Sequence, residues 1–265
     1  MPAWSAVSAL SAPFALQAAP LIAATLLLAA AALLRAPPAY AAGQGGAQAA
    51  ATPAKRTAFQ IRCEDTISKT VSVLSAQQNG HSVNNTLSYR SLTVMKGAAA
   101  PNTYVLGLTK TESRVAIGVD GPMLRDPITG YECVAPQITV KLTYVPIVIY
   151  IGKEFAPGTC AYEEILTHEY RHMNAYLDHL PKVEKTVRAA LSKRFEGKPL
   201  YAPGGTARAA LAREVDRGWM AYIKAEMAKV ETLQAAIDAP AEYARLSRAC
   251  NGEIQAVLNK GRARR

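Results

Sequence analysis

The order of apolar and polar positions changes character near residue 156. Before it, short apolar stretches are bounded by turn residues, which is typical of strands. The clearest is Ile138–Tyr144, where apolar residues alternate with smaller or polar ones, and the apolar run Ile147–Ile151 follows it. The other expected strands are Phe59–Cys63, Leu92–Met95, Tyr104–Thr109 and Arg114–Val119. We expect these segments to form a small antiparallel sheet.

After Gly158 the apolar positions recur at helical spacing. Thr159 can cap the N-terminus of a helix, and we expect Pro181 to kink or end that helix. The later segments are a resumed helix over Val183–Phe195, a loop over Glu196–Gly205, a long helix from about Thr206 to Ala239 and a last helix from about Pro240 to Asn259. The expected fold class is therefore α+β. A single domain would span residues 58–259, mainly strand over 58–156 and helical over 157–259.

The N-terminal segment differs from the rest of the chain. Residues 1–34 carry no ionisable side chain and include a long apolar run, and Ala39-Tyr40-Ala41 fits a small-x-small cleavage pattern. We expect residues 1–41 to be a signal peptide. The alternative is an uncleaved membrane anchor through residues 10–34, which is long enough to span a bilayer. Residues 42–57, rich in Ala, Gly, Gln, Thr and Pro, are expected to form a flexible linker.

The four cysteines also indicate an exported protein. An even number of cysteines in an exported chain is typical of a disulfide framework. Three pairings are open, and we favour Cys63–Cys133 with Cys160–Cys250 because each bond then stays within one half of the chain. The protein is expected to be secreted or periplasmic.

The net charge of +10 is partly concentrated in a basic tail over residues 260–265. Such a tail can attract an anionic envelope surface. No nucleic-acid-binding motif accompanies the charge, so we expect no specific nucleic-acid partner. Contact with a membrane is expected only if the N-terminal segment stays uncleaved.

Candidate chemistry lies in one stretch, His168-Glu169-Tyr170-Arg171-His172, which is an H-E-x-x-H motif. Two imidazoles four residues apart on a helix project from one face, so both can reach the same metal ion. Glu169 can then act as a general base toward a metal-bound water. The motif predicts one Zn²⁺ ion bound by His168 and His172, with Glu169 as the catalytic residue.

A catalytic zinc site normally has a third protein ligand. If the chain returns antiparallel to the motif helix, the residues opposite the motif fall near 226–231. One face of that helix is apolar and is expected to point inward, with the residues Ala212, Trp219, Ile223, Val230, Leu233 and Ile237. Asp216 and Glu226 interrupt this face, and only Glu226 is expected to lie level with the motif. Glu226 is therefore our candidate, with Glu231, Glu214 and Asp178 as alternatives. His179 is expected further along the motif helix.

On these residues the chain resembles the zincin-type metallopeptidases, in particular an exported bacterial type with a glutamate as third ligand. The resemblance implies that His168 and His172 bind zinc, that Glu169 is the general base, and that a sheet edge over Ile138–Ile151 binds an extended peptide. Arg171 and Asn174 depart from the stricter family signature. Groups available to stabilise an oxyanion are Tyr170, Tyr176, Tyr222, Arg171 and His179.

The expected function is an exported zinc metalloendopeptidase that hydrolyses a protein or peptide substrate. The alternative is a non-catalytic, zincin-like protein of the cell envelope that binds a metal or a partner.

Overall fold

A computed structural model describes residues 10–11, 56–67, 70–97 and 103–263. The chain divides into two units, residues 1–12 with 58–265 and residues 13–57, and the fold described below is that of the first. The signal peptide or anchor expected over residues 1–41 and the linker expected over 42–57 lie outside the described residues, apart from two residues in each. The last two residues of the basic tail lie outside them as well.

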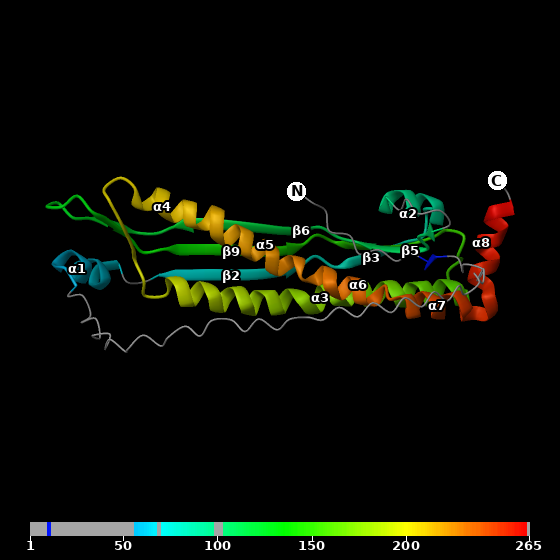
Figure 1. Cartoon of the computed structure of the whole chain (residues 1–265). Coiled ribbons are helices and arrows are strands. Elements are labelled where there is room, and N and C mark those ends of the chain that lie inside the picture. Colours follow the sequence, from blue (N-terminus) through cyan, green and yellow to red (C-terminus); the bar gives the residue numbers. More distant parts are fainter. Residues whose placement is uncertain (1–9, 12–55, 68–69, 98–102, 264–265) are drawn as a thin grey trace, which may run out of the picture. The chain divides into compact units, whose positions relative to one another are not determined.

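Three segments of the chain form two three-stranded sheets, and each segment contributes one strand to each sheet (Figure 1). One has the order β2 (Val71–Gln78), β9 (Gln137–Tyr144), β6 (Ser113–Asp120), and the other has the order β3 (His81–Asn84), β10 (Ile147–Ile151), β5 (Gly107–Lys110). In both sheets the central strand is parallel to one neighbour and antiparallel to the other. The sheets are therefore mixed, because β2 and β3, which the sequence pattern did not indicate, pair in parallel.

Short breaks in the three segments join these sheets end to end. The Asn79 side-chain amide donates to the Tyr144 carbonyl at 3.0 Å, and the Thr111 hydroxyl donates to the Val145 carbonyl at 2.8 Å. At the same break, the Ile147 amide donates to the Gly80 carbonyl at 3.0 Å. Hydrogen bonding thus continues across the break.

The remaining strands are short. β7 (Met123–Arg125), β8 (Glu132–Val134) and β11 (Leu200–Ala202) form a third sheet, and β1 (Leu10–Ser11) pairs with β4 (Thr103–Tyr104). Helix α1 (Ala58–Ile67) is joined to β8 by the disulfide Cys63–Cys133, which confirms that pairing.

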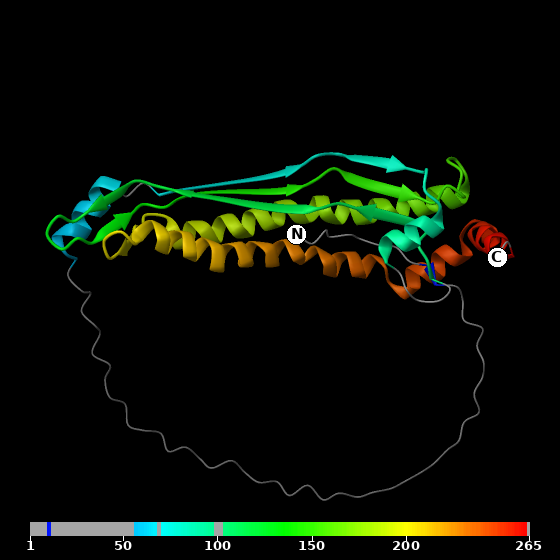
Figure 2. The ribbon, with the colours of Figure 1, turned by 90° about the horizontal axis from the view of Figure 1, so that it is seen from above.

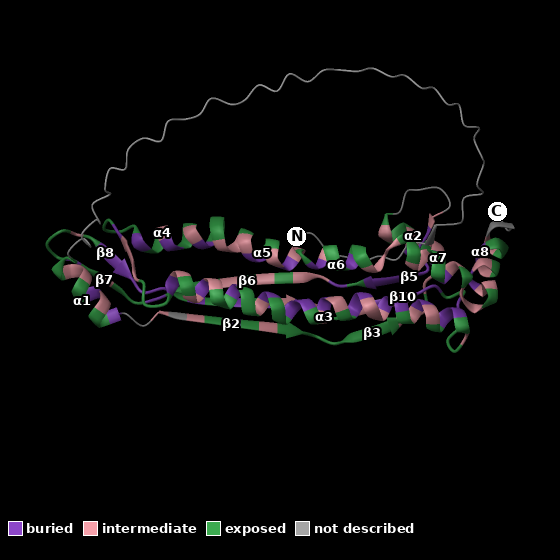
Figure 3. Cartoon of the chain, turned by 60° about the horizontal axis from the view of Figure 1, so that its bottom comes forward, coloured by how far each residue is buried: buried purple, intermediate pink, exposed green. Residues whose placement is uncertain are grey.

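Helix α3 (Cys160–Phe195) spans 36 residues without interruption, so Pro181 neither ends nor divides it. Thr159 caps it as expected, its hydroxyl accepting from the Tyr162 amide at 3.3 Å. A buried stripe runs along α3 (Figure 3). None of the described helices, α3 included, combines the length and the apolar composition needed to cross a membrane.

The chain returns beside α3 as a series of helices (Figure 2): α4 (Ala207–Glu214), the π-helical turn η1 (Val215–Trp219), α5 (Met220–Ala228), α6 (Val230–Ile237), α7 (Pro240–Arg248), the 3₁₀ turn η2 (Ala249–Gly252) and α8 (Glu253–Ala263). Of the expected inward residues, Ile223 and Val230 are buried. Leu211 is buried in place of the expected Ala212, and Gln234 is buried in place of Leu233.

The α3 helix covers the inner face of the sheet. Along β9 the alternate residues Ile138, Val140, Leu142 and Tyr144 are buried, and Lys141 on the opposite face is exposed. These apolar residues belong to one core with the buried stripe of α3. The sheet and its core thus fix the position of the helix that carries the motif.

The α+β class is confirmed, as are the strands expected over 114–119, 138–144 and 147–151. The strands expected over Phe59–Cys63 and Leu92–Met95 are wrong, because these residues belong to α1 and to α2 (Tyr89–Lys96). In α2, Ser88 accepts from the Ser91 amide and Gly97 ends the helix in a left-handed conformation, so capping decides the local structure. The segment expected to be a sheet edge, Ile138–Ile151, forms central strands.

Candidate metal centre

The two motif histidines lie side by side on the face of α3 that packs against α6. Both are essentially inaccessible to solvent, with exposed fractions of 1% for His168 and 0% for His172. Because α6 runs antiparallel to α3, His172 faces Gln234 and His168 faces a residue one turn later, Asp238. Gln234 holds this register by donating its amide to the His172 carbonyl at 3.1 Å.

Three donor atoms converge at this point. The Nε2 atoms of His168 and His172 lie 3.2 Å apart, and Asp238 Oδ1 lies 3.3 Å from the first and 3.2 Å from the second. The three atoms therefore form a nearly equilateral triangle of two imidazole nitrogens and one carboxylate oxygen.

The size of that triangle fits a metal ion. Zinc in proteins is tetrahedral with Zn–N and Zn–O bonds of about 2.0–2.2 Å, which places neighbouring donors about 3.3–3.6 Å apart. The separations of 3.2–3.3 Å lie at the short end of this range, within about 0.1 Å. Two imidazoles and one carboxylate are also a donor set that catalytic zinc sites use. The residues present thus fit a zinc ion.

The other imidazole nitrogens also have partners, as metal-binding histidines normally do. His172 Nδ1 lies 2.5 Å from Gln234 Oε1, and His168 Nδ1 lies 3.2 Å from Glu242 Oε1. With His172 Nδ1 protonated and donating to Gln234 Oε1, the lone pair of its Nε2 points to the donor triangle, whereas His168 Nδ1 has both an acceptor, Glu242 Oε1, and a donor, the Arg171 guanidinium, within reach. The ring orientations are therefore set from α6 and α7.

Arg171, which departs from the family signature, lies beside the outer ring nitrogen of His168. Its guanidinium contacts Glu242 Oε1 and lies 2.8 Å from His168 Nδ1. Arg245 donates to both oxygens of Glu242, at 3.0 and 2.9 Å. Hydrogen bonds from Arg245 and Arg171 lower the pKa of Glu242 to about 2. Arg171 thus helps to hold, in its ionised form, the carboxylate that orients His168.

The electrostatics of the donor triangle favour positive charge between its members. Burial lowers the pKa of His172, but the hydrogen bond to Asp238 and the nearby charge of Glu169 raise it above its usual value overall. Burial acts to raise the pKa of Asp238, and the hydrogen bonds from the two imidazoles outweigh it and lower that pKa to about 2. An ionised Asp238 suits the binding of a cation.

Glu169 lies on the side of α3 that faces β5. The Thr109 hydroxyl lies 2.8 Å from Glu169 Oε2 and 3.0 Å from its carbonyl oxygen. A Cβ atom on Gly107 would come within 2.5 Å of Glu169 Oε1, so only glycine leaves room for the carboxylate. Glu169 Oε1 is buried and has no hydrogen-bond partner among the described residues. One carboxylate oxygen is thus fixed and the other is available to accept a proton.

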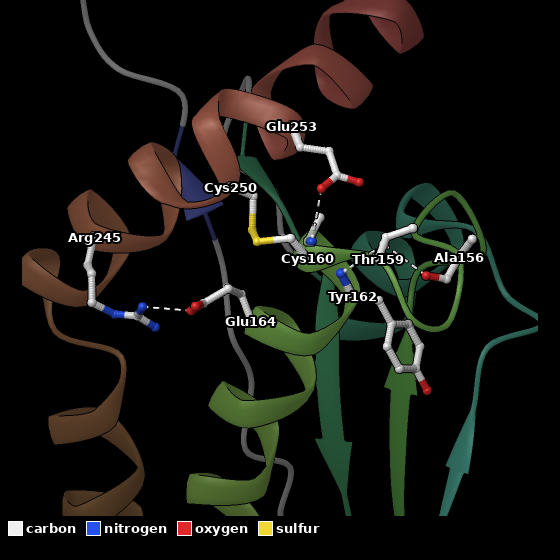
Figure 4. The surroundings of a disulfide bond; sticks show 9 residues. Ala156, Thr159, Cys160, Tyr162, Glu164, Arg245, Cys250 and Glu253 are labelled. Carbon is white, nitrogen blue, oxygen red and sulfur yellow. Dashed lines mark hydrogen bonds and ion pairs between the residues drawn. A yellow bond between two sulfur atoms is a disulfide. The ribbon is translucent and has the colours of Figure 1, made fainter.

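A disulfide ties the segment that carries Asp238 and Glu242 to the motif helix α3. Cys160 at the start of α3 is bonded to Cys250 in η2, as expected from the sequence. Around it, Arg245 pairs with Glu164 at 2.7 Å, and the Ala161 amide donates to Glu253 at 3.1 Å (Figure 4). The two disulfides are typical of proteins outside the reducing cytoplasm.

The structure places the expected third ligand elsewhere. Both oxygens of Glu226 lie 2.7 Å from Lys229 Nζ, and Glu226 is not part of the donor group. Among the alternatives, Glu214 pairs with Arg194 at 2.7 Å, Asp178 is exposed, and Glu231 is half-buried outside the group. His179 is buried further along α3, also outside the group.

Sequence reasoning missed Asp238, Gln234 and Glu242, although two of them carry a recognisable signal. Asp238 follows the last residue of α6, and an acid at the C-terminal end of a helix is unfavourable unless a cation compensates it. Gln234 is a buried amide at helical spacing from Val230, and a buried amide needs a partner. Glu242 gave no signal of its own.

Comparisons of the chain with protein-family models, with curated proteins and with solved structures gave no match.

Replacement of Asp238 by Ala is expected to weaken zinc binding more than about 100-fold, beyond the effect of losing an outer partner. Glu226→Ala, which removes an acid of the same helical series, is the control and should leave the affinity unchanged. Competition with a chelator of known zinc affinity measures both. A larger loss in Glu226→Ala than in Asp238→Ala would contradict the assignment.

The disulfides provide a second, matched comparison. Replacement of both Cys160 and Cys250 by Ser should lower zinc affinity about tenfold or more. The reason is that α7, which carries the His168 partner Glu242, is then no longer bonded to α3. The same replacement of Cys63 and Cys133 opens a loop of similar length, 70 residues against 90, away from the donors. Zinc titrations on the folded fractions of both variants give the answer, and equal affinities would refute a specific role for the bond at α3.

Proposed function

We propose that this protein is an exported zinc-dependent metallopeptidase in which His168, His172 and Asp238 hold the ion and Glu169 is the general base. The single observation that carries the proposal is the triangle of donor atoms with sides of 3.2–3.3 Å beside the H-E-x-x-H glutamate. A zinc ion held there would have a fourth position for water, would lower the pKa of that water to near neutrality and would polarise a substrate carbonyl.

The chain's own residues supply the proton transfer. Glu169 directly follows His168 on α3, and its charge acts to raise the pKa of the His172 imidazole. With Oε2 held by Thr109, the unpartnered Oε1 accepts the proton that the attacking water loses. The same oxygen then returns the proton to the nitrogen of the departing amine.

Export is part of the proposal. The two disulfides support a location in an oxidising compartment, and the apolar N-terminal segment with its small-x-small pattern supports a signal peptide. Together they favour a secreted or periplasmic enzyme acting on protein or peptide.

Burial of the site favours a second candidate, a non-catalytic zinc-binding protein of the envelope. Glu169 has an exposed fraction of 0%, like His172. A cavity of about 690 Å³ lies apart from the donors, between the sheet and α5, where Arg114, Lys141 and Met220 are among its lining residues. A closed metal site is typical of a structural role. The retained, half-partnered Glu169 favours the enzyme, since a structural ion does not need it.

Glu169→Gln keeps the size of the side chain and removes the base, so it is expected to bind one zinc ion and to lose about 10²–10⁴-fold in kcat on casein. Asp178→Asn makes the same chemical change at an exposed position of the same helix and should retain wild-type activity. Stoichiometric zinc with equal, negligible cleavage by wild type and Glu169→Gln would leave only the non-catalytic candidate.

A further inference from the structure

A cavity outside the donor group lies where α5 packs beside the edge strand β6 (Figure 1). Its volume of about 690 Å³ falls within the range of about 300–1,000 Å³ that ligand sites usually occupy. Four successive residues of β6, residues 113–116, line it. Because neighbouring residues of a strand point to opposite faces, the cavity reaches both faces of the sheet at this edge.

The two sides of the cavity differ in polarity. Val115 and Met227 pack in the main hydrophobic core, and Met220 lies seven residues before Met227 on the same face of α5. The other side is formed by the outer face of the sheet, where Lys141 and Thr143 alternate with the buried residues of β9. A ligand in the cavity therefore meets an apolar wall on one side and polar groups on the other.

The positive charge of the cavity is not balanced by its own lining residues, none of which is acidic. Arg114 is bound to Glu112 through two hydrogen bonds, of 3.1 and 3.0 Å. Lys141 and Lys224 are exposed, and neither forms a hydrogen bond or an ion pair with any residue that the structure describes. Two ammonium groups thus remain for a ligand, one from the sheet and one from the helix.

We propose that this cavity binds a single-chain amphipathic anion, such as a fatty acid or an alkyl phosphate. Its head group lies between Lys141 and Lys224, where two ammonium groups form charge-assisted hydrogen bonds with a carboxylate or a phosphate. Its alkyl chain lies against Val115, Met220 and Met227, and the flexible methionine side chains adapt to the shape of the chain. The site does not depend on the metal centre.

Isothermal titration calorimetry with decanoate, below its critical micelle concentration and at low ionic strength, tests the cavity directly. One decanoate is expected to bind per protein. Acetate has the head group without the chain, and 1-decanol has the chain without the charge, so both are expected to bind at least about tenfold more weakly. Decyl phosphate separates the two kinds of head group, since the tighter of the two anions identifies the group that the lysines select.

Variants separate the two halves of the site. Lys141→Gln and Lys224→Gln are each expected to weaken decanoate binding about 3- to 10-fold, and the double variant more than either. Lys185→Gln removes the charge of an exposed lysine on α3 and should match wild type. Met220→Gln should reduce the gain in affinity between octanoate and decanoate, because the apolar wall loses part of its contact with the chain.

The proposal is overturned if neither decanoate nor decyl phosphate shows saturable binding, or if the double lysine variant binds them as tightly as wild type. An equal loss in Lys185→Gln also overturns it, because the binding would then reflect the net charge of the whole chain. Acetate that binds as tightly as decanoate would exclude the apolar half of the site. Any of these results leaves the metal centre untouched, since none of the replaced residues belongs to the donor group.

Discussion

The antiparallel contact between α3 and α6 is the constraint on which the site depends. It sets His172 opposite Gln234 and His168 opposite Asp238, and the bond from the Gln234 amide to the His172 carbonyl fixes this register. Two imidazoles on one helix face are only half of a metal site. The carboxylate at the end of α6 completes a triangle whose size fits an ion, and burial of the two imidazoles with partial burial of Asp238 strengthens the attraction for a cation.

Much of this was readable from the sequence. The H-E-x-x-H spacing located His168, Glu169 and His172 on one helix, since the helical repeat alone brings residues four apart together. The apolar alternation of Ile138–Tyr144 located a buried strand, and keeping each disulfide within one half of the chain gave both pairings. These features depend on short-range geometry or on simple topology.

The expected third ligand, Glu226, depended on long-range register, and the structure does not bring it to the donor group. Placing Glu226 opposite the motif assumed that residues 226–231 lie level with it, whereas the residues level with His172 and His168 are Gln234 and Asp238. Asp238 is brought into place by a tertiary contact that no local pattern specifies.

X-ray absorption at the zinc edge, on protein purified with one equivalent of zinc, tests the donor triangle most directly. The account predicts a first shell of nitrogen and oxygen at about 2.0–2.2 Å with the multiple scattering of two imidazoles. It predicts no sulfur at about 2.3 Å, since all four cysteines are in disulfides. A shell without two imidazoles, or the absence of stoichiometric zinc, would contradict it.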